Sequence, residues 1–421
     1  MTEATHEIVV VGGNLAGVQI SHYLLRKTIP ALQATDKHQT TAYHLTLISP
    51  NTHLFYKIAA PRALINPTLI PTEKIFKPLT PAFQQYGESF EYLQGEAVDL
   101  DITHREVVAR MYTARGGERR VKYDSLVIAT GASTTSPLWS FHGGHGESVN
   151  AFRTLYRQLP EAESIVIAGG GPVGVETAGE IASAYPDAKV TLVGGEAGYL
   201  LPREKVAMGL KAEDMLEDLG VDVKLGVKLS DANASSITRP IPLSDGTFLS
   251  PSVFINATGP RIYNTSWLPP AWLDDSGQVL VRDAYFRVQT TSTSISAKNV
   301  YVIGDAAAGY KRTAMELDAM VPTVASSIAI DIMVERKLAS QMRGSSLNGL
   351  MGLVKPFKKP YVGEQIDFKP ARDTMMVSIG PKGGVGVRLG WGVPSWMVKK
   401  EKAERFCLEL VDPLVDGTKF D

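Results

Sequence analysis

The chain has 421 residues, enough for roughly two to three domains with a large buried core. Hydrophobic residues make up 44% and charged residues 21%, which excludes a disordered, collagen-like or disulfide-stapled chain. With 43 Lys and Arg against 44 Asp and Glu, the formal net charge is −1. This balance argues against nucleic acid as the main partner, because nucleic-acid-binding proteins carry an excess of positive charge.

The chain contains a single cysteine, Cys407. One thiol cannot form an intrachain disulfide, a Cys-x-x-Cys redox pair or a cysteine-based zinc site. We expect Cys407 to be a small buried hydrophobe in a reducing compartment. The eight histidines are scattered, and the glycine-rich spacing of His142 and His145 favours a surface turn over zinc ligands. No metal site is predicted.

The N-terminal residues and the hydropathy pattern bear on the compartment. The first residues lack the basic and apolar segments of a secretory signal, and Thr2 in place of glycine excludes N-myristoylation. No run approaches about 18 uninterrupted apolar residues, so we expect no membrane-spanning helix. The protein is expected to be cytoplasmic or peripheral on an intracellular membrane.

The first predicted elements are a strand and a helix that flank a glycine-rich turn. Residues 7–11 predict a buried parallel strand, and residues 18–25 have helical spacing. The turn between them contains Gly12, Gly13, Asn14 and Gly17. This order is the context that the dinucleotide-binding fingerprint requires, because amides at a helix start hold a pyrophosphate. Asn14 replaces the middle glycine and narrows the approach to the phosphate, and a plain tight turn is the alternative.

A second fingerprint is more regular. Residues 164–168 predict a strand, residues 175–182 predict a helix, and residues 189–193 predict the next strand. The turn holds all three fingerprint glycines, which are Gly169, Gly171 and Gly174. The two fingerprints lie 157 residues apart, so we predict two separate nucleotide-binding domains.

Three later strands end in small residues. Residues 123–131 and 253–259 are apolar strands that both end in Ala-Thr-Gly, and residues 299–306 end in Gly-Asp. An acid such as Asp305 at a strand end faces the crevice where parallel strands finish. The alternative for Asp305 is an Asx turn that caps the corner between strand and helix.

The order of these five motifs resembles the two-dinucleotide-binding-domain flavoproteins, over about residues 6–330. Residues 56–63, 377–386 and 398–406 are most similar to the apoptosis-inducing-factor-like, mitochondrion-associated (ferroptosis-suppressor) quinone oxidoreductases. The resemblance implies an α/β fold of two Rossmann-like domains, the second inserted in the first, plus a small α+β C-terminal unit. The implied segments are 1–140 with 280–345 for FAD, 141–279 for NAD(P)H, and 346–421 for the C-terminal unit.

The resemblance also implies FAD and either NADH or NADPH as cofactors. The implied FAD contacts are Gly12, Gly13, Asn14, Gly17, Ser49, Arg62, Thr130, Gly131 and Asp305. The implied NAD(P)H contacts are Gly169, Gly171, Gly174, Glu196 and Gly259. Asp305 would bind the ribityl chain or the pyrophosphate. Ser49 replaces the acid that usually binds the adenosine ribose, and Glu196 disfavours a 2′-phosphate, which favours NADH without excluding NADPH.

Glu176 and Lys57 are the predicted catalytic residues. In related flavoproteins an acid at the place of Glu176 pairs with a basic residue beside the flavin ring. Lys57 or Arg62 is the expected partner here, and Arg62 is alternatively a direct FAD contact. For Glu176 the alternative is an acid that the helix N-terminus stabilises.

The cysteine count restricts the reaction class. Disulfide reductases of this superfamily need a cysteine pair beside the flavin, and Cys407 has no partner. Hydride is therefore expected to pass from NAD(P)H to FAD, and electrons to an external acceptor, with a quinone as the leading candidate. The alternatives are a reductase of a ferredoxin-like protein and a nucleotide-binding redox sensor with little turnover.

The C-terminal quarter is basic. Residues 355–405 hold eleven Lys and Arg against five Asp and Glu, an excess of six positive charges. Trp391 and Trp396 interleave with Lys399, Lys400 and Lys402. This pattern fits either a solvated face of a small antiparallel domain or peripheral attachment to an anionic membrane, a mitochondrial one included. The oligomeric state is not predicted.

Overall fold

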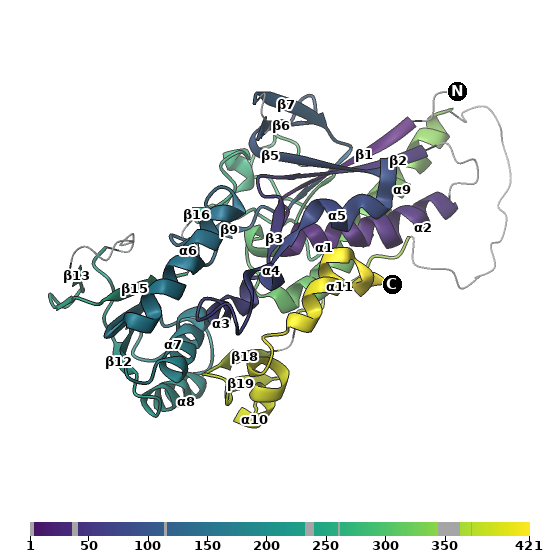
Figure 1. Cartoon of the computed structure of the whole chain (residues 1–421). Coiled ribbons are helices and arrows are strands. Elements are labelled where there is room, and N and C mark those ends of the chain that lie inside the picture. The colour runs from purple at the N-terminus through teal and green to yellow at the C-terminus, as the bar shows by residue number, and fades with distance from the viewer. Residues whose placement is uncertain are drawn as a thin grey trace.

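The largest sheet is assembled from three separate stretches of the chain. The computed structural model describes residues 4–35, 41–112, 116–231, 240–259, 262–343, 363–371 and 373–421. Figure 1 shows this sheet at one end, a smaller sheet with its helices at the other, and the C-terminal segment along the junction between them. We call the two sheets with their helices the first and the second unit.

The seven-stranded sheet of the first unit has the order β17-β8-β1-β2-β5-β6-β7. Its parallel strands are β1 (Ala4–Val11), β2 (Thr41–Ser49), β5 (Phe90–Asp101), β8 (Ser125–Ile128) and β17 (Val300–Val302). β6 (Glu106–Met111) and β7 (Glu118–Lys122) continue it antiparallel. In β1, Ile8, Val9 and Val10 are fully buried, as expected for a parallel strand that helices cover on both faces.

The second unit has a four-stranded parallel sheet in the order β12-β11-β10-β15. Its strands are β10 (Ser164–Ala168), β11 (Lys189–Gly195), β12 (Asp222–Leu225) and β15 (Val253–Asn256). Its helices are α6 (His145–Gln158), α7 (Pro172–Ala184) and α8 (Val206–Glu217). The chain leaves the first sheet after β8 and returns at β17, so the second unit is inserted in the first, and the predicted fold class is confirmed.

The two chain segments that connect the units pair with each other in a small two-stranded sheet. β9 (Ala132–Ser133) on the outgoing chain pairs antiparallel with β16 (Ile262–Tyr263) on the returning chain. The remaining strands and helices are α2 (Ile29–Thr35), β3 (His53–Phe55), α3 (Ala60–Ala63), α4 (Thr72–Ile75), β4 (Phe76–Pro78), α5 (Leu79–Phe83), β13 (Ile241–Pro242) and β14 (Phe248–Leu249).

The last residues, 373–421, form the C-terminal unit. It holds an antiparallel sheet of β18 (Met375–Ser378), β19 (Gly384–Arg388) and β20 (Trp391–Gly392), followed by α10 (Ser395–Val398) and α11 (Val411–Asp416). α11 returns to the first unit, where His22 Nε2 lies 2.7 Å from the carbonyl oxygen of Val415. Burial lowers the pKa of His22 to about 4, so this ring is neutral at pH 7. The predicted start of the unit at residue 346 lies outside the described residues.

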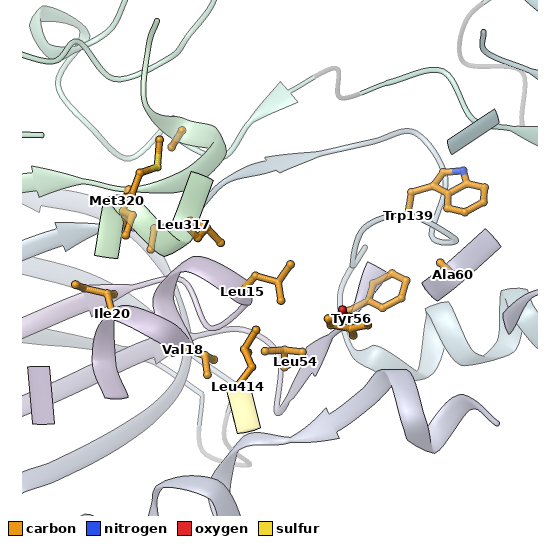
Figure 2. Close-up of a cluster of buried hydrophobic side chains, with 14 of the residues drawn as sticks. Leu15, Val18, Ile20, Leu54, Tyr56, Ala60, Trp139, Leu317, Met320 and Leu414 are labelled. Carbon is orange, nitrogen blue, oxygen red and sulfur yellow. The ribbon is translucent and has the colours of Figure 1, made fainter. Parts of the chain in front are cut away.

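One helix in the described ranges is long and apolar enough to cross a membrane by length and composition, namely Ala314–Leu338, most of which is α9 (Leu317–Arg343). Isolated polar residues interrupt its apolar run without lowering the mean hydropathy enough to miss this criterion, and the expectation of no membrane-spanning helix stays a prediction. About 61% of its apolar window is buried, and α9 packs against α1 (Leu15–Tyr23). Figure 2 shows Leu15 and Val18 of α1 with Leu317 and Met320 of α9 in one buried cluster.

α7 packs directly on the C-terminal unit at Gly179. A Cβ at this position would lie 2.8 Å from the backbone nitrogen of Gly380, which a backbone atom cannot evade by a rotamer change. Gly179→Val should therefore lower the free energy of unfolding by ~1–3 kcal/mol, measured by urea titration. Gly146→Ala in α6, where a Cβ meets no atom within 4 Å, is the matched control and should not lower it. Equal stability of both variants would contradict the close packing.

Candidate active site

The first fingerprint forms a turn that only glycine permits at two positions. Gly12 has φ +117°, and a Cβ there would lie 2.3 Å from the carbonyl oxygen of Ala129. A Cβ on Gly17 would lie 1.7 Å from the carbonyl oxygen of Gly12, so α1 packs directly on the turn. The turn therefore brings the start of α1 to the ends of β1 and β8.

Asn14 and Ser49, the two residues that depart from the usual fingerprint pattern, both form hydrogen bonds within the protein. Asn14 precedes α1 without capping it, and its Oδ1 accepts a hydrogen bond of 3.2 Å from the backbone N–H of Phe55. Ser49 is buried, and its hydroxyl donates to the carbonyl oxygen of Asn51 over 3.2 Å. A Cβ on Gly13 would lie 2.6 Å from Ser49 Oγ. The Ser49 hydroxyl is thus engaged inside the turn in this structure, and its contact with a ribose stays a prediction.

The ends of β8 and β17 complete one site. The backbone N–H of Ile303 donates to the carbonyl oxygen of Ile128 over 2.9 Å, so the residues that follow both strands share one sheet edge. Thr130 Oγ1 is buried there without a hydrogen-bond partner in the described part of the chain. We call the residues at this edge the first cradle: Gly12, Gly13, Thr130, Gly131, Gly304 and Asp305.

Lys57 lies across the first cradle from Asp305. Its Nζ is 3.4 Å from Asp305 Oδ2, and the side chains are 43% and 27% exposed. Lys57, which we predicted to be catalytic, and Asp305, which we predicted to bind FAD, thus form one ion pair at the first cradle. Such a half-exposed pair is weak, so either partner can turn toward a ligand at little cost.

The second fingerprint repeats the arrangement in the second unit. Gly169 has φ +128°, and a Cβ there would lie 2.5 Å from the carbonyl oxygen of Ala257. A Cβ on Gly174 would lie 1.8 Å from the carbonyl oxygen of Gly169. A Cβ on Gly171 or Gly259, in contrast, would meet no atom within 4 Å. We call Gly169, Gly171, Gly174 and Gly259 the second cradle.

The open space at the second cradle fits the pyrophosphate of a dinucleotide. Gly171 precedes α7 with φ −80° and ψ 178°, and no side chain caps the helix there. The amides of the first helical turn are thus free to bind an anion. Both cradles fit the cofactor group that the sequence predicts for them: the first offers an unpartnered hydroxyl, and the second offers space that a side chain would fill.

Glu196 has a neighbour that sequence reasoning missed. Lys228 Nζ lies 2.5 Å from Glu196 Oε1, and both side chains are more than half exposed. Lys228 follows β12, far from β11 in the sequence, so no local pattern relates the two residues. An ammonium beside the carboxylate offsets its repulsion of a 2′-phosphate, so the argument for NADH over NADPH is weakened.

Glu176 does not pair with Lys57 or Arg62, and this prediction is wrong. Its carboxylate lies 2.5 Å from Lys402 Nζ of the C-terminal unit and accepts the backbone N–H of Ser378 over 3.1 Å. The Glu176 side chain is 4% exposed and that of Lys402 is 16% exposed. Burial raises the pKa of Glu176, while the Lys402 charge opposes the rise.

Arg62 is also engaged within the protein, which corrects its assignment as a flavin contact. Its guanidinium makes two hydrogen bonds of 2.7 Å to Glu180, one turn after Glu176 on α7. It also donates to the carbonyl oxygen of Ala403 over 2.6 Å and lies over the Phe406 ring. The sequence did contain a pattern that could have drawn attention to Glu180. Glu176 and Glu180 are four residues apart in an apolar helix, so they share one face and need cationic partners there. We call Arg62, Glu176, Glu180 and Lys402 the junction.

Cys407 lies beside the junction and is half-buried, not fully buried as expected. Its carbonyl oxygen accepts the Tyr56 hydroxyl over 2.9 Å. Burial raises the pKa of the Cys407 thiol, so the reactive thiolate is disfavoured. Cys407 therefore serves the packing of this region and no thiol relay.

Part of the basic C-terminal region forms an exposed aromatic surface. Trp391 is 80% and Trp396 is 63% exposed. We call Leu389, Trp391, Trp396, Lys399 and Lys400 the C-terminal patch, whose members are all exposed. Lys402 does not belong to it, because its ammonium is at the junction, and residues 355–362 and 372 of the basic region lie outside the described residues.

The comparisons with known proteins agree with this geometry. The family model described as pyridine nucleotide-disulphide oxidoreductase matches residues 6–323. Oxidoreductase phnG of Penicillium herquei is 30% identical, over 97% of this chain and 96% of that protein. Ferroptosis suppressor protein 1 of Homo sapiens is 23% identical, over 94% of this chain and 92% of that protein.

The solved structures show the same fold. The sulfide:quinone oxidoreductase of Aquifex aeolicus superposes with a TM-score of 0.67 at 15% identity, over 98% of this chain and 92% of that chain. The predicted resemblance to the two-dinucleotide-binding-domain flavoproteins, and within them to the ferroptosis-suppressor proteins, is confirmed. The chain belongs to the pyridine nucleotide-disulphide oxidoreductase family, whose members bind FAD and NAD(P)H.

Proposed function

We propose that the protein is an FAD-dependent NAD(P)H:quinone oxidoreductase. When bound, FAD takes a hydride from NAD(P)H and passes electrons on to an acceptor. The proposal is carried by one combination: two open dinucleotide cradles in a chain with a single, half-buried cysteine. A relay to a thiol substrate needs a cysteine pair, so the electrons leave directly to an external acceptor.

The first cradle holds FAD in this proposal, and the second holds NAD(P)H. The amides at the starts of α1 and α7 bind the two pyrophosphates, because a helix N-terminus attracts negative charge. Asp305 binds hydroxyls of the flavin dinucleotide, and Lys57 lies beside it as its ion-pair partner. No side-chain acid or base is required for a hydride transfer between two cofactors.

Glu176 acts here as a positioning residue. It lies in the first turns of α7, directly after the second cradle, and its carboxylate fixes Lys402 of the C-terminal unit. The C-terminal unit is thereby held against α7, the helix that begins at the second cradle. A fixed arrangement of both cofactors matters because hydride transfer depends steeply on distance and orientation.

A quinone is favoured as acceptor by the C-terminal patch. Exposed tryptophans beside lysines suit the interface of an anionic bilayer, in which a long-chain quinone dissolves. We therefore also propose a peripheral location on an intracellular membrane. The same lysines would suit an acidic, ferredoxin-like protein. If a ferredoxin-like protein is the acceptor, the enzyme should reduce quinones slowly. The rate of electron transfer to the acidic protein should then fall steeply as the salt concentration rises.

The cofactor assignment is tested by Gly171→Val. The variant should fold, because Gly171 has an extended backbone and open space around it. The added side chain fills the second cradle, so anaerobic reduction of the bound flavin by NADH or NADPH should require at least ~10-fold more nucleotide, about 1.4 kcal/mol of binding. FAD content should not change, and a soluble quinone should reoxidise the reduced wild-type protein.

Gly144→Val, at an equally open extended position outside both cradles, is the control and should be reduced normally. Loss of flavin from Gly171→Val would show that the cradles were assigned in reverse. A wild-type flavin that neither nucleotide reduces would overturn the function, and one that quinone fails to reoxidise would overturn the acceptor alone.

Asp305→Ala should weaken FAD binding by roughly 1.5–3 kcal/mol, because a charged hydrogen-bond partner is lost from the first cradle. The dissociation constant, measured by flavin fluorescence on reconstitution of the apoprotein, should rise about 10- to 150-fold. Asp275→Ala removes an exposed carboxylate from a surface loop and is the control. Unchanged FAD affinity would mean that Asp305 only forms a turn.

The membrane proposal is tested with Trp391→Ala/Trp396→Ala/Lys399→Ala/Lys400→Ala. Each lysine near an anionic surface contributes about 1 kcal/mol, so this variant should sediment with anionic liposomes far less than wild type. It should keep its activity on a water-soluble quinone, since Lys402 is unchanged. Lys27→Ala/Lys122→Ala removes two exposed lysines elsewhere and should sediment normally. Wild type that stays in the supernatant even at low salt would refute the membrane contact.

A further inference from the structure

Glu316 is a buried acid with an unsatisfied oxygen. The residue is 2% exposed, and its Oε2 has no hydrogen-bond partner among the described residues. The charge of Lys311 acts on this carboxyl. The Lys311 ammonium, however, pairs with Asp373 at 3.0 Å. In the described part of the chain, no cation forms an ion pair with Glu316.

The position of Glu316 relates it to the first cradle. It ends the short turn Ala314–Glu316, and α9 begins at the next residue. A Cβ on Gly304 would lie 3.0 Å from the Ala16 side chain and 3.8 Å from that of Leu317, so the starts of α1 and α9 meet beside Gly304. Figure 2 shows Leu15 and Leu317 in the same buried cluster. Glu316 therefore directly precedes a residue whose side chain lies beside Gly304 of the first cradle.

Burial and nearby charges act in opposite directions on the pKa of Glu316. Burial raises the pKa of the carboxyl, while the nearby charge of Lys311 and the start of α9 act in the opposite direction. Tyr310 is the other titratable group that is coupled to it. A neutral carboxyl carries an O–H donor, and a buried donor without an acceptor is costly.

We propose that Glu316 is protonated and donates a hydrogen bond from its free oxygen to the FAD held in the first cradle. The flavin dinucleotide offers ring carbonyls, ring nitrogens and ribityl hydroxyls as acceptors. Thr130 Oγ1, which follows the neighbouring strand β8, is a second buried oxygen without a hydrogen-bond partner among the described residues. Thr130 and Glu316 could thus both hydrogen-bond to the same ligand. A donor toward the flavin stabilises the reduced form, which carries more negative charge. Glu316 thereby raises the reduction potential of the bound flavin.

Two substitutions separate a neutral donor from an anion. Glu316→Gln keeps the shape and an N–H donor, whereas Glu316→Leu keeps the volume without any polar group. Glu316→Gln should match wild type in FAD affinity and in flavin midpoint potential at pH 7. Glu316→Leu should bind FAD about five- to tenfold more weakly and have a more negative midpoint potential.

Asp318→Asn is the matched control, because it removes a carboxylate from the same helix start at an exposed position that pairs with Lys419. It should leave both quantities unchanged. Difference infrared spectra on FAD binding should show the band of a protonated carboxyl in wild type and Asp318→Asn, and no such band in Glu316→Gln. This readout keeps the test decisive if circular dichroism shows that Glu316→Leu does not fold.

Increasing pH gives an independent check. Once Glu316 ionises, the midpoint potential of wild type should fall below that of Glu316→Gln. A positive shift in Glu316→Gln at pH 7 would show an ionised carboxylate and overturn the inference, as would FAD affinity and potential in Glu316→Leu equal to those of wild type. The inference rests on the proposed FAD site. If the wild-type protein binds no FAD, that site fails as well, whereas a flavoprotein that is insensitive to Glu316 refutes this role alone.

Discussion

Two buried ion pairs on one face of α7 hold the three parts of the chain together. Glu176 and Glu180 lie one turn apart, and both side chains are 4% exposed. A buried carboxylate is strongly destabilising unless it is paired, and removal of one partner from such a pair typically costs ~3–5 kcal/mol. Lys402 comes from the C-terminal unit and Arg62 from the first unit. The folded state of α7 therefore requires that both other parts are in place.

This constraint determines where the cradles lie relative to one another. α7 begins at the second cradle, and Arg62 lies in α3, a few residues after Lys57 at the first cradle. The Arg62–Glu180 pair thus links the two cradles through short, rigid segments. The crossing strands β9 and β16 provide only two paired residues each, so they fix the arrangement less firmly. In the proposed function, hydride transfer between two bound dinucleotides would depend on this link, because neither cradle alone can set the distance between their reactive rings.

The sequence was sufficient for the features that are local. The strands at 7–11 and 164–168 and both fingerprint turns follow from β-branched runs and glycine spacing within a few residues. The junction was not predictable in the same way, since Arg62 and Glu180 are 118 residues apart. Lys402 appeared to be one more lysine of a basic stretch, and only its burial reveals its pairing. The hydrogen bond of Ser49 to Asn51 was not predictable either, since backbone geometry and not residue type decides where its hydroxyl points.

The glycines of the two fingerprints divide into those that the fold needs and those that a ligand needs. Gly12, Gly17, Gly169 and Gly174 face backbone atoms so closely that any side chain would clash, whatever is bound. Gly171 and Gly259 have no left-handed φ, and a Cβ on either would meet no described atom within 4 Å, so the folded chain itself gives no steric reason for their small size. A site that is already shaped without its ligand loses little entropy on binding. Both cradles are of this kind, and in the proposed function the unpartnered oxygen of Thr130 at the first one is available to its ligand.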